Sequence, residues 1–287
     1  MQVKPFDAPF GADIVGVQLA DISDENFAAI YEVWLGAGVL RFRDQELDDD
    51  TLKAFSSRFG ELEYAPHGNV TAAQLAEIPN PYVATISNIV ENGQPIGGLS
   101  NLETSWHTDM SYIEQPPTAS LLYAVEVPAS GGDTTFCCMR SAWRELPPSL
   151  RERCATMQIK HDAAHDSIGK MRRGHSPFDD AKEAPGVLHP VFIKHPETDD
   201  RALYLGRRKF AYIDGLALDE SEALLDKIWQ HVAKPTHCWT QQWRVGDLVI
   251  WDNRIVMHQR ASFADSQRRL MRRTQVRSRQ APIAAVS

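Results

Sequence analysis

The sequence predicts a mainly β domain, an antiparallel barrel or double-sheet jelly roll with helices packed outside it. In the second half, short apolar and β-branched segments follow one another at hairpin spacing, separated by turn residues. These segments lie too close together for the repeated βαβ units of a parallel sheet. The 287 residues fit one large domain or two small ones and are ample for a well-buried core. We expect a single domain over 1–287.

The first half combines short strands with two helices. Residues 24–38 have helical spacing, with Gly36 and Gly38 near the end. Residues 48–60 begin with aspartates, which suit the positive end of a helix dipole, and Gly60 is the expected stop. Alternating or β-branched residues predict strands at 12–22, 38–44 and 82–90.

The second half is dominated by strands, which we expect at 119–127, 134–138, 187–195, 202–206, 237–245, 247–252, 255–261 and 269–277. Two short helices separated by Pro147 and Pro148 are expected within 139–154, and the clearest helix covers 219–234. The span 163–186 is polar and rich in Gly, Pro, Asp and His, which is typical of a long mobile loop.

Composition narrows the classes of function. The formal net charge of −8 disfavours nucleic acid as a partner. No stretch approaches the roughly 18 apolar residues of a membrane helix, and the N-terminus lacks the pattern of a signal peptide. The four cysteines form no C-x-x-C pair, which favours free thiols in a cytoplasmic protein.

The stretch WHTDMSY, at 106–112, suggests a metal site. Residues two apart on a strand point to the same face, so His107 and Asp109 would both aim inward if this stretch is extended. A distant histidine on another strand, His258 in IVMHQR, would complete a set of two histidines and one carboxylate. That set leaves coordination positions open and is typical of non-haem Fe(II) oxygenases. The alternatives are a surface loop for the H-x-D pair and a hydrogen-bonded core histidine for His258.

Two arginines follow at a fixed distance from His258. Arg269 and Arg273 would share one strand face, where burial is costly unless each guanidinium meets an anion. The alternative is an exposed, arginine-rich edge. A second histidine pair, His161 and His165, superficially resembles the zinc protease motif H-E-x-x-H, but Asp162 replaces the catalytic glutamate, so zinc hydrolysis is disfavoured.

Three blocks carry a resemblance to a known family: WHTDMSYIEQPPTASLLYAVEVPASGGDTTF, LHPVFIKHP and VIWDNRIVMHQRASFADSQRRLMRRTQV. Together they closely resemble the taurine dioxygenase/2,4-dichlorophenoxyacetate dioxygenase family. The resemblance implies a double-stranded β-helix fold, cupin-like, that uses Fe(II), 2-oxoglutarate as cosubstrate and O2. It is weakest over 65–103 and 163–186.

The resemblance also implies roles for single residues. The expected iron ligands are His107, Asp109 and His258. Arg269 and Thr134 match the residues that bind the distal carboxylate of 2-oxoglutarate. The expected contacts to the primary substrate are Arg273, His67 and Phe210. Trp251 matches an aromatic residue near the iron, and a role as a core tryptophan is the alternative.

The implied reaction is hydroxylation of a small anionic organic molecule with release of succinate and CO2. Because Asp109 is present, hydroxylation is favoured over halogenation. The substrate could be a sulfonate, an alkylsulfate or an aryloxyalkanoate, and hydroxylation beside sulfur or oxygen would lead to C–S or C–O cleavage. Relatives imply a homo-oligomer, a dimer or a tetramer. Two alternatives remain: a non-catalytic β-barrel protein that binds small molecules, and a cupin-like metalloenzyme that does not use 2-oxoglutarate.

Overall fold

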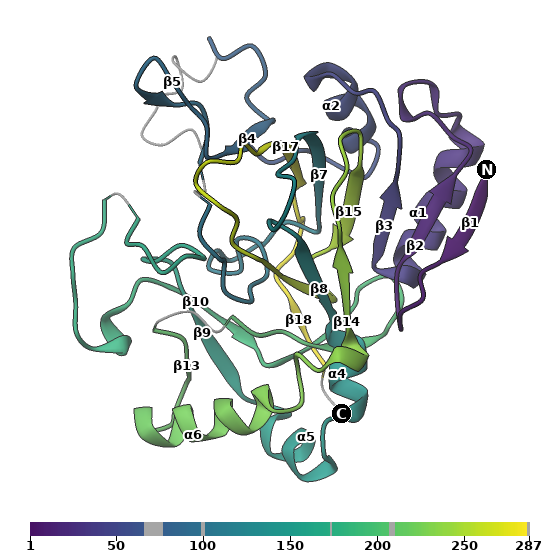
Figure 1. Ribbon diagram of the computed structural model, residues 1–287. Coiled ribbons are helices and arrows are strands. Elements are labelled where there is room, and N and C mark those ends of the chain that lie inside the picture. The colour runs from purple at the N-terminus through teal and green to yellow at the C-terminus, as the bar shows by residue number, and fades with distance from the viewer. Residues whose placement is uncertain (66–76, 99–100, 173, 207–209, 286–287) are drawn as a thin grey trace.

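A seven-stranded sheet forms the larger layer of the protein in the computed structural model, which describes residues 1–65, 77–98, 101–172, 174–206 and 210–285 (Figure 1). The strands lie in the order β1 (Gln2–Pro5), β2 (Ala12–Val15), β3 (Val39–Phe42), β15 (Leu248–Asp252), β7 (Ala119–Glu126), β17 (Leu270–Val276) and β4 (Ala84–Ser87). Neighbours pair antiparallel, except that β2 and β3 are parallel.

A smaller sheet packs against one face of the large sheet. It has the order β14 (Cys238–Gln241), β8 (Thr134–Cys138) and β16 (Val256–Arg260). The two sheets meet at aromatic rings: Trp251 of β15 lies 5.4 Å from Phe136 and 4.8 Å from the imidazole of His258, measured between ring centroids. Residues carried by β16 therefore face the inner side of the large sheet.

The central strands of the large sheet are buried on both faces. In β15, Val249 and Trp251 face the small sheet, while Leu248 and Ile250 belong to a second apolar cluster formed with the first two helices. This two-sided burial explains why the strand is apolar at four consecutive positions instead of alternating with polar residues. Side chains on the inner face of β15 and of its neighbour β7 therefore point between the two sheets.

Helices α1 (Asp24–Ala37) and α2 (Asp49–Ser57) cover the outer face of the large sheet (Figure 1). The side chain of Ser23 caps α1 by accepting a hydrogen bond from the backbone N–H of Asn26, and Gly38 ends this helix with a positive φ of 75°. The predicted end of the second helix was wrong, because α2 ends at Ser57, before Gly60.

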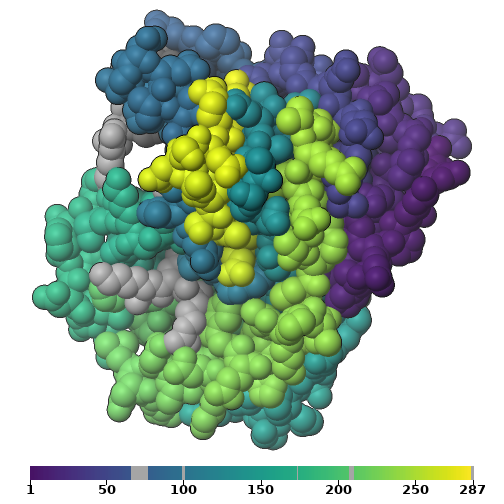
Figure 2. All heavy atoms as spheres, viewed as in Figure 1, coloured from purple at the N-terminus to yellow at the C-terminus, as the bar shows by residue number. Residues whose placement is uncertain are grey.

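The remaining elements surround these two layers. Three-stranded sheets are formed by β10 (Gly186–Pro190), β9 (Gln158–Asp162) and β13 (Tyr212–Ile213), and by β12 (Arg201–Leu203), β11 (Phe192–Lys194) and β18 (Ile283–Ala284), and a hairpin by β5 (Val90–Glu91) and β6 (Gln94–Pro95). The other helices are α4 (Met139–Glu145), α5 (Pro148–Cys154) and α6 (Leu218–Trp229), with short 3-10 turns at Leu19–Asp21, Ala181–Glu183 and Pro235–His237. In the space-filling view, β17, β7 and β15 lie side by side (Figure 2).

The mainly β prediction with peripheral helices is confirmed, and so are the helix at 24–38 and the two helices within 139–154. The helix predicted at 219–234 is present, but it ends at Trp229, five residues early. Several strands are shorter than predicted: 12–22 keeps only β2 and a 3-10 turn, and 82–90 keeps β4 and the first residue of β5. Among the described residues, no helix is long and apolar enough to cross a bilayer.

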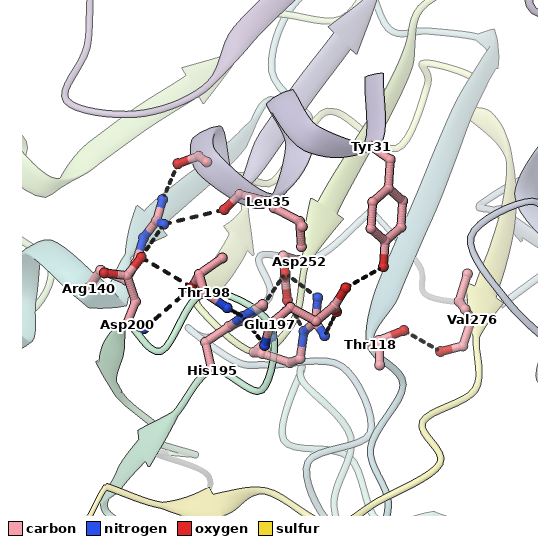
Figure 3. A network of polar contacts seen from close by, with 12 residues as sticks. Tyr31, Leu35, Thr118, Arg140, His195, Glu197, Thr198, Asp200, Asp252 and Val276 are labelled. Atoms are coloured by element: carbon pink, nitrogen blue, oxygen red, sulfur yellow. Dashed lines mark hydrogen bonds and ion pairs between the residues drawn. The ribbon is translucent and has the colours of Figure 1, made fainter. Parts of the chain in front are cut away.

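A buried polar network fastens the loop after β11 to the rest of the molecule (Figure 3). The Nε2 atom of His195 lies 3.0 Å from the carboxylate of Asp252, and both side chains are buried. Glu197 accepts a hydrogen bond from the hydroxyl of Tyr31 on α1. Arg254 forms ion pairs with both carboxylates, so the turn between β15 and β16 is held in a fixed conformation directly before the strand that carries His258.

Candidate metal centre

Three side chains that are distant in the sequence meet between the two sheets. The possible ligand atoms of His107, Asp109 and His258 all lie within 4.8 Å of one another, and the three residues are buried. Oδ1 of Asp109 is 3.8 Å from Nε2 of His107 and 4.0 Å from Nε2 of His258. Metal–ligand bonds are about 2.0–2.2 Å long, so two of them span at most about 4.4 Å, which accommodates both of these distances. The cluster therefore has the size and the donor types for one divalent metal ion.

The backbone holds the two histidines against each other. The N–H of His107 donates to the carbonyl of His258, and the N–H of His258 donates to the carbonyl of His107, both at 2.9 Å. The stretch 106–110 is not a regular strand, so the condition set for His107 and Asp109 is not met: His107 forms an isolated bridge, and the chain turns at Met110, where φ is 48°. Asp109 still points toward the imidazoles, with Oδ1 at 3.8 and 4.0 Å from their Nε2 atoms.

Local contacts favour the protonation states of His107 and Asp109 that bind a cation. Nδ1 of His107 lies 2.7 Å from the carbonyl oxygen of Ser105, which can only accept, so Nδ1 carries the proton and Nε2 presents its lone pair. Burial raises the pKa of Asp109, but Arg273, the two imidazoles and a hydrogen bond from Ser120 outweigh that effect, so its pKa lies below the usual range. Asp109 is therefore a carboxylate, as a metal ligand must be.

Two buried guanidinium groups line the same cavity as His107 and His258. Arg269 is 2% exposed and Arg260 is 6% exposed. Burial lowers the pKa of each, and for Arg269 the charge of Arg260 lowers it further. Among the described residues, no carboxylate forms an ion pair with Arg269, and its Nε makes no hydrogen bond. This end of the cavity therefore favours an anion.

Several other residues predicted around the cluster also line this cavity. Thr134 and Trp251 line the cavity, and Nε1 of Trp243 donates to the hydroxyl of Thr134 at 3.0 Å. Arg273 also lines the cavity, with one nitrogen 3.5 Å from Oδ1 of Asp109. A β-bulge between Leu270 and Met271 interrupts the strand spacing assumed for the two arginines, yet Arg269 and Arg273 reach the same cavity.

The predicted substrate contacts are less central. Phe210 packs against the rings of His165 and Phe178 and does not line the cavity. His67 lies outside the described residues. In the predicted loop 163–186, Ser167 reaches the cavity, while the mobility of the loop stays a prediction.

The zinc protease alternative receives no support. Nδ1 of His165 bonds to Asp162 at 2.8 Å, and His161 packs against the rings of His189 and Tyr204. Within the part of the chain that the structure describes, His107, Asp109 and His258 are the one group of three such residues close enough to share a metal ion.

A larger cavity, of about 390 Å³, lies elsewhere, between α1, the loop after β11 and the C-terminal residues 277–283. Its walls include Tyr31, Trp34 and Arg254, and none of the three clustered residues lines it. Two surface hollows, of about 530 Å³ beside Leu47 and about 470 Å³ beside Asp13, are larger still, so size does not identify the reaction site. We assign the chemistry to the small cavity at the cluster, because the unmatched guanidinium and the metal-type donors converge there.

Sequence reasoning missed Arg260, Ser120, Asn253 and Gln275. Arg260 could have been found, because it lies two residues after His258 on β16 and so shares its face. Ser120 stands out only as the one serine within the run ASLLYA. Its partners come from other strands, so their proximity could not be read from spacing.

Comparisons with known proteins identify relatives over nearly the whole chain. Residues 2–275 match the family described as "Taurine catabolism dioxygenase TauD, TfdA family". The chain is 31% identical to the (S)-phenoxypropionate/alpha-ketoglutarate-dioxygenase of Sphingobium herbicidovorans, over 94% of this chain and 92% of that protein. It is 30% identical to the alpha-ketoglutarate-dependent sulfate ester dioxygenase of Pseudomonas putida, over 95% and 88%. The crystal structure of AAD-2 in complex with Mn(II) and N-oxalylglycine superposes with a TM-score of 0.82 at 25% identity, covering 99% of both chains.

Proposed function

The chain belongs to the TauD/TfdA family of 2-oxoglutarate (alpha-ketoglutarate)-dependent dioxygenases, and from this premise we propose that it uses Fe(II), 2-oxoglutarate and O2 to hydroxylate a small anionic organic molecule. The observation that carries the proposal is the meeting of His107, Asp109 and His258 beside the buried, unmatched Arg269. One part of the cavity suits a divalent cation and the other suits a carboxylate. An Fe(II)–2-oxoglutarate pair needs both.

The residues present fit the metal and the cosubstrate. His107, Asp109 and His258 would hold the iron, because two imidazole nitrogens and one carboxylate oxygen can reach one ion and leave coordination positions open. Arg269 would bind the distal carboxylate of 2-oxoglutarate, and the hydroxyl of Thr134 would donate to it. Bound Fe(II) with 2-oxoglutarate and O2 supplies the oxidising power for C–H hydroxylation, with succinate and CO2 as co-products.

The protein's own contribution is binding, orientation and exclusion of water. Arg269 and Arg260 add positive charge to the lining of the cavity, which favours a dianionic cosubstrate. Trp251 packs its ring against His258 and limits the ring orientations of that imidazole. The burial of all three ligand residues keeps bulk water from the metal position, so electrostatic interactions there are strong.

We assign the fold to the double-stranded β-helix class. The supporting features are the antiparallel seven-stranded sheet facing the small sheet β14-β8-β16 and a candidate metal site between them. A cupin-like jelly roll combines these same features.

Arg273 supports an anionic primary substrate. Its guanidinium lines the cavity and is 3.5 Å from Asp109, so an incoming sulfate, sulfonate or carboxylate would find a charge partner close to the reacting centre. Two relatives are named for phenoxypropionate and for sulfate esters, which are anions with a carbon bonded to an ether or ester oxygen. We therefore favour an aryloxyalkanoate or alkylsulfate, with C–O cleavage after hydroxylation.

A succinate-release screen tests the proposal. Purified protein with Fe(II), ascorbate, 2-oxoglutarate and air is offered aryloxyalkanoates, alkylsulfates and alkylsulfonates one at a time, with Asp109→Ala as the inactive control. We expect at least one class to raise succinate formation well above the substrate-free rate, with a matching oxidised product. Equal succinate formation with every anion and with none would contradict the anionic-substrate assignment.

A further inference from the structure

A relay of buried hydrogen bonds leads to Asp109, and we propose that this relay keeps Asp109 bound to the metal through one oxygen only. The relay begins at Trp251, passes through Asn253 and Ser120, and ends at Oδ2 of Asp109. Gln275 joins it as a side branch at Ser120. The inference rests on the proposed metal centre and adds three positioning residues to it: Ser120, Asn253 and Gln275.

The contacts are short and shielded from water. Nε1 of Trp251 donates to Oδ1 of Asn253 at 2.9 Å, and Nδ2 of Asn253 donates to Oγ of Ser120 at 3.0 Å. The hydroxyl of Ser120 donates to Oδ2 of Asp109 at 2.7 Å, and Nε2 of Gln275 reaches the same hydroxyl at 3.3 Å. All five side chains are at most 5% exposed, so water does not compete for these bonds.

The donor and acceptor groups of the relay allow its hydrogen bonds to run in one direction only, from Trp251 toward Asp109. The indole N–H of Trp251 can only donate, so it fixes the oxygen of the Asn253 amide on its own side and the NH2 on the side of Ser120. The amide hydrogens of Asn253 and Gln275 then occupy the lone pairs of the Ser120 hydroxyl. The single proton of Ser120 is left to point at Asp109, which as a carboxylate can only accept.

The strand register explains why these residues meet. In the large sheet, Ser120 of β7 is paired with Trp251 of β15 on one side and with Gln275 of β17 on the other. The three residues lie in one row across neighbouring strands, on the face that looks toward the small sheet. A serine within this apolar row would be costly if its hydroxyl were unsatisfied, and here it makes three hydrogen bonds.

The consequence concerns the two oxygens of Asp109. Oδ2 is held by Ser120, while Oδ1 faces the two imidazole nitrogens at 3.8 and 4.0 Å. A carboxylate fixed in this way offers Oδ1 to the metal and withholds Oδ2. One coordination position that a two-oxygen carboxylate would fill stays open for the cosubstrate. Without the hydrogen bond from Ser120, Oδ2 can turn toward the metal, while Arg273 still lies 3.5 Å from Oδ1.

The test compares two buried serines by titration with Mn(II) alone. Ser120→Ala removes the last donor of the relay, and Ser56→Ala removes an equally buried hydroxyl that bonds to Leu52 and Thr274 and does not line the cavity. We expect Ser120→Ala to weaken Mn(II) binding by about 10- to 100-fold. We expect Ser56→Ala to bind Mn(II) like the wild type, and both variants to melt at lower temperature without metal.

A spectrum and two further variants separate positioning from general loss of structure. The ligand-field bands of bound Co(II) at saturation should change in Ser120→Ala, because Oδ2 becomes available, and stay unchanged in Ser56→Ala. Ser120→Thr keeps the hydroxyl and should restore Mn(II) affinity to within about threefold of wild type. Asn253→Ala should weaken binding in the wild-type background and add nothing to Ser120→Ala, because both act through one bond.

The outcomes are distinct. If Ser120→Ala binds Mn(II) as tightly as Ser56→Ala and gives the wild-type Co(II) spectrum, the relay has no role. If Ser120→Ala fails to fold, wild-type affinity and spectrum in Asn253→Ala overturn the proposal in its place. If the wild-type protein itself binds neither metal ion, the metal centre of the proposed function fails.

Discussion

Arg269 is the side chain on which cosubstrate binding depends most directly. It is buried, its pKa is lowered by burial and by Arg260, and no carboxylate among the described residues compensates its charge. A cation in that position destabilises the protein until an anion reaches it. The structure therefore explains why the position is arginine: a planar guanidinium can hold a carboxylate with two parallel hydrogen bonds.

We expect Arg269→Ala to raise the KM for 2-oxoglutarate by about 10- to 150-fold, which corresponds to losing a charge-assisted interaction of about 1.5–3 kcal/mol. Steady-state succinate formation at varied 2-oxoglutarate measures it. The adjacent Arg268→Ala is the matched control, because Arg268 is exposed and pairs with Glu126. An equal KM in the two variants would show that Arg269 does not bind the cosubstrate.

Arg273 should act on the primary substrate and not on 2-oxoglutarate. We expect Arg273→Ala to keep the 2-oxoglutarate affinity within about threefold, since the two guanidinium groups serve different anions, and to lose the stimulation of succinate release by the best anionic substrate. Arg272→Ala, whose side chain pairs with Asp49, is the control. Retained stimulation in Arg273→Ala would move the substrate anion to another residue.

Single residues also show where sequence reasoning succeeded. His107, Asp109 and His258 were found from residue type and order, and the structure brings them together. Their roles as iron ligands stay predictions. The spacing argument itself was incomplete: His107 and Asp109 do not share a regular strand, because the chain turns at Met110.

At the scale of elements, local sequence patterns were reliable where one face is apolar and the ends are capped. The helix α1 has Ser23 at its start and Gly38 at its end, and both signals are local. Strand ends were less predictable, because they depend on pairing partners far along the chain. The bulge at Leu270 and Met271 is of this kind, since it arises from the register with β7.

The turn between β15 and β16 provides a prediction about stability (Figure 3). Burial raises the pKa of Asp252, but Arg254 and His195 outweigh it, so the folded-state pKa lies below the unfolded value of about 3.9. A carboxyl of this kind stabilises the fold above the unfolded pKa, and the stabilisation is lost as the pH falls toward the lower folded value. Wild-type stability should therefore decline below about pH 4.

We expect Asp252→Asn to lower the free energy of unfolding at pH 7 by about 3–5 kcal/mol, because Arg254 loses its buried partner. The variant should also lose part of the decline in stability below about pH 4. Urea unfolding at pH 7 and at acid pH measures both effects. Asp24→Asn, which breaks an exposed pair with Arg58, should change little. Equal stability of the two variants would contradict a structural role for this network.

At the scale of the whole molecule, the two facing sheets explain how distant residues form one site. The small sheet supplies His258 and Thr134, the large sheet supplies Ser120 and Arg273, and the loop at 101–118 supplies His107 and Asp109. The overall class of fold followed from strand density and spacing. The pairing of particular strands did not, because order within a sheet depends on long-range contacts. His67 lies outside the described residues, so its predicted contact with the substrate stays a prediction.

The most direct test of the central claim is an anaerobic titration with Fe(II) and 2-oxoglutarate, followed by visible absorbance. If His107, Asp109 and His258 hold iron and Arg269 holds the cosubstrate beside it, a weak charge-transfer band should appear with one equivalent of each. The band should be missing in Asp109→Ala with an intact fold. Folded, iron-loaded wild-type protein without such a band would contradict the use of 2-oxoglutarate at this metal centre.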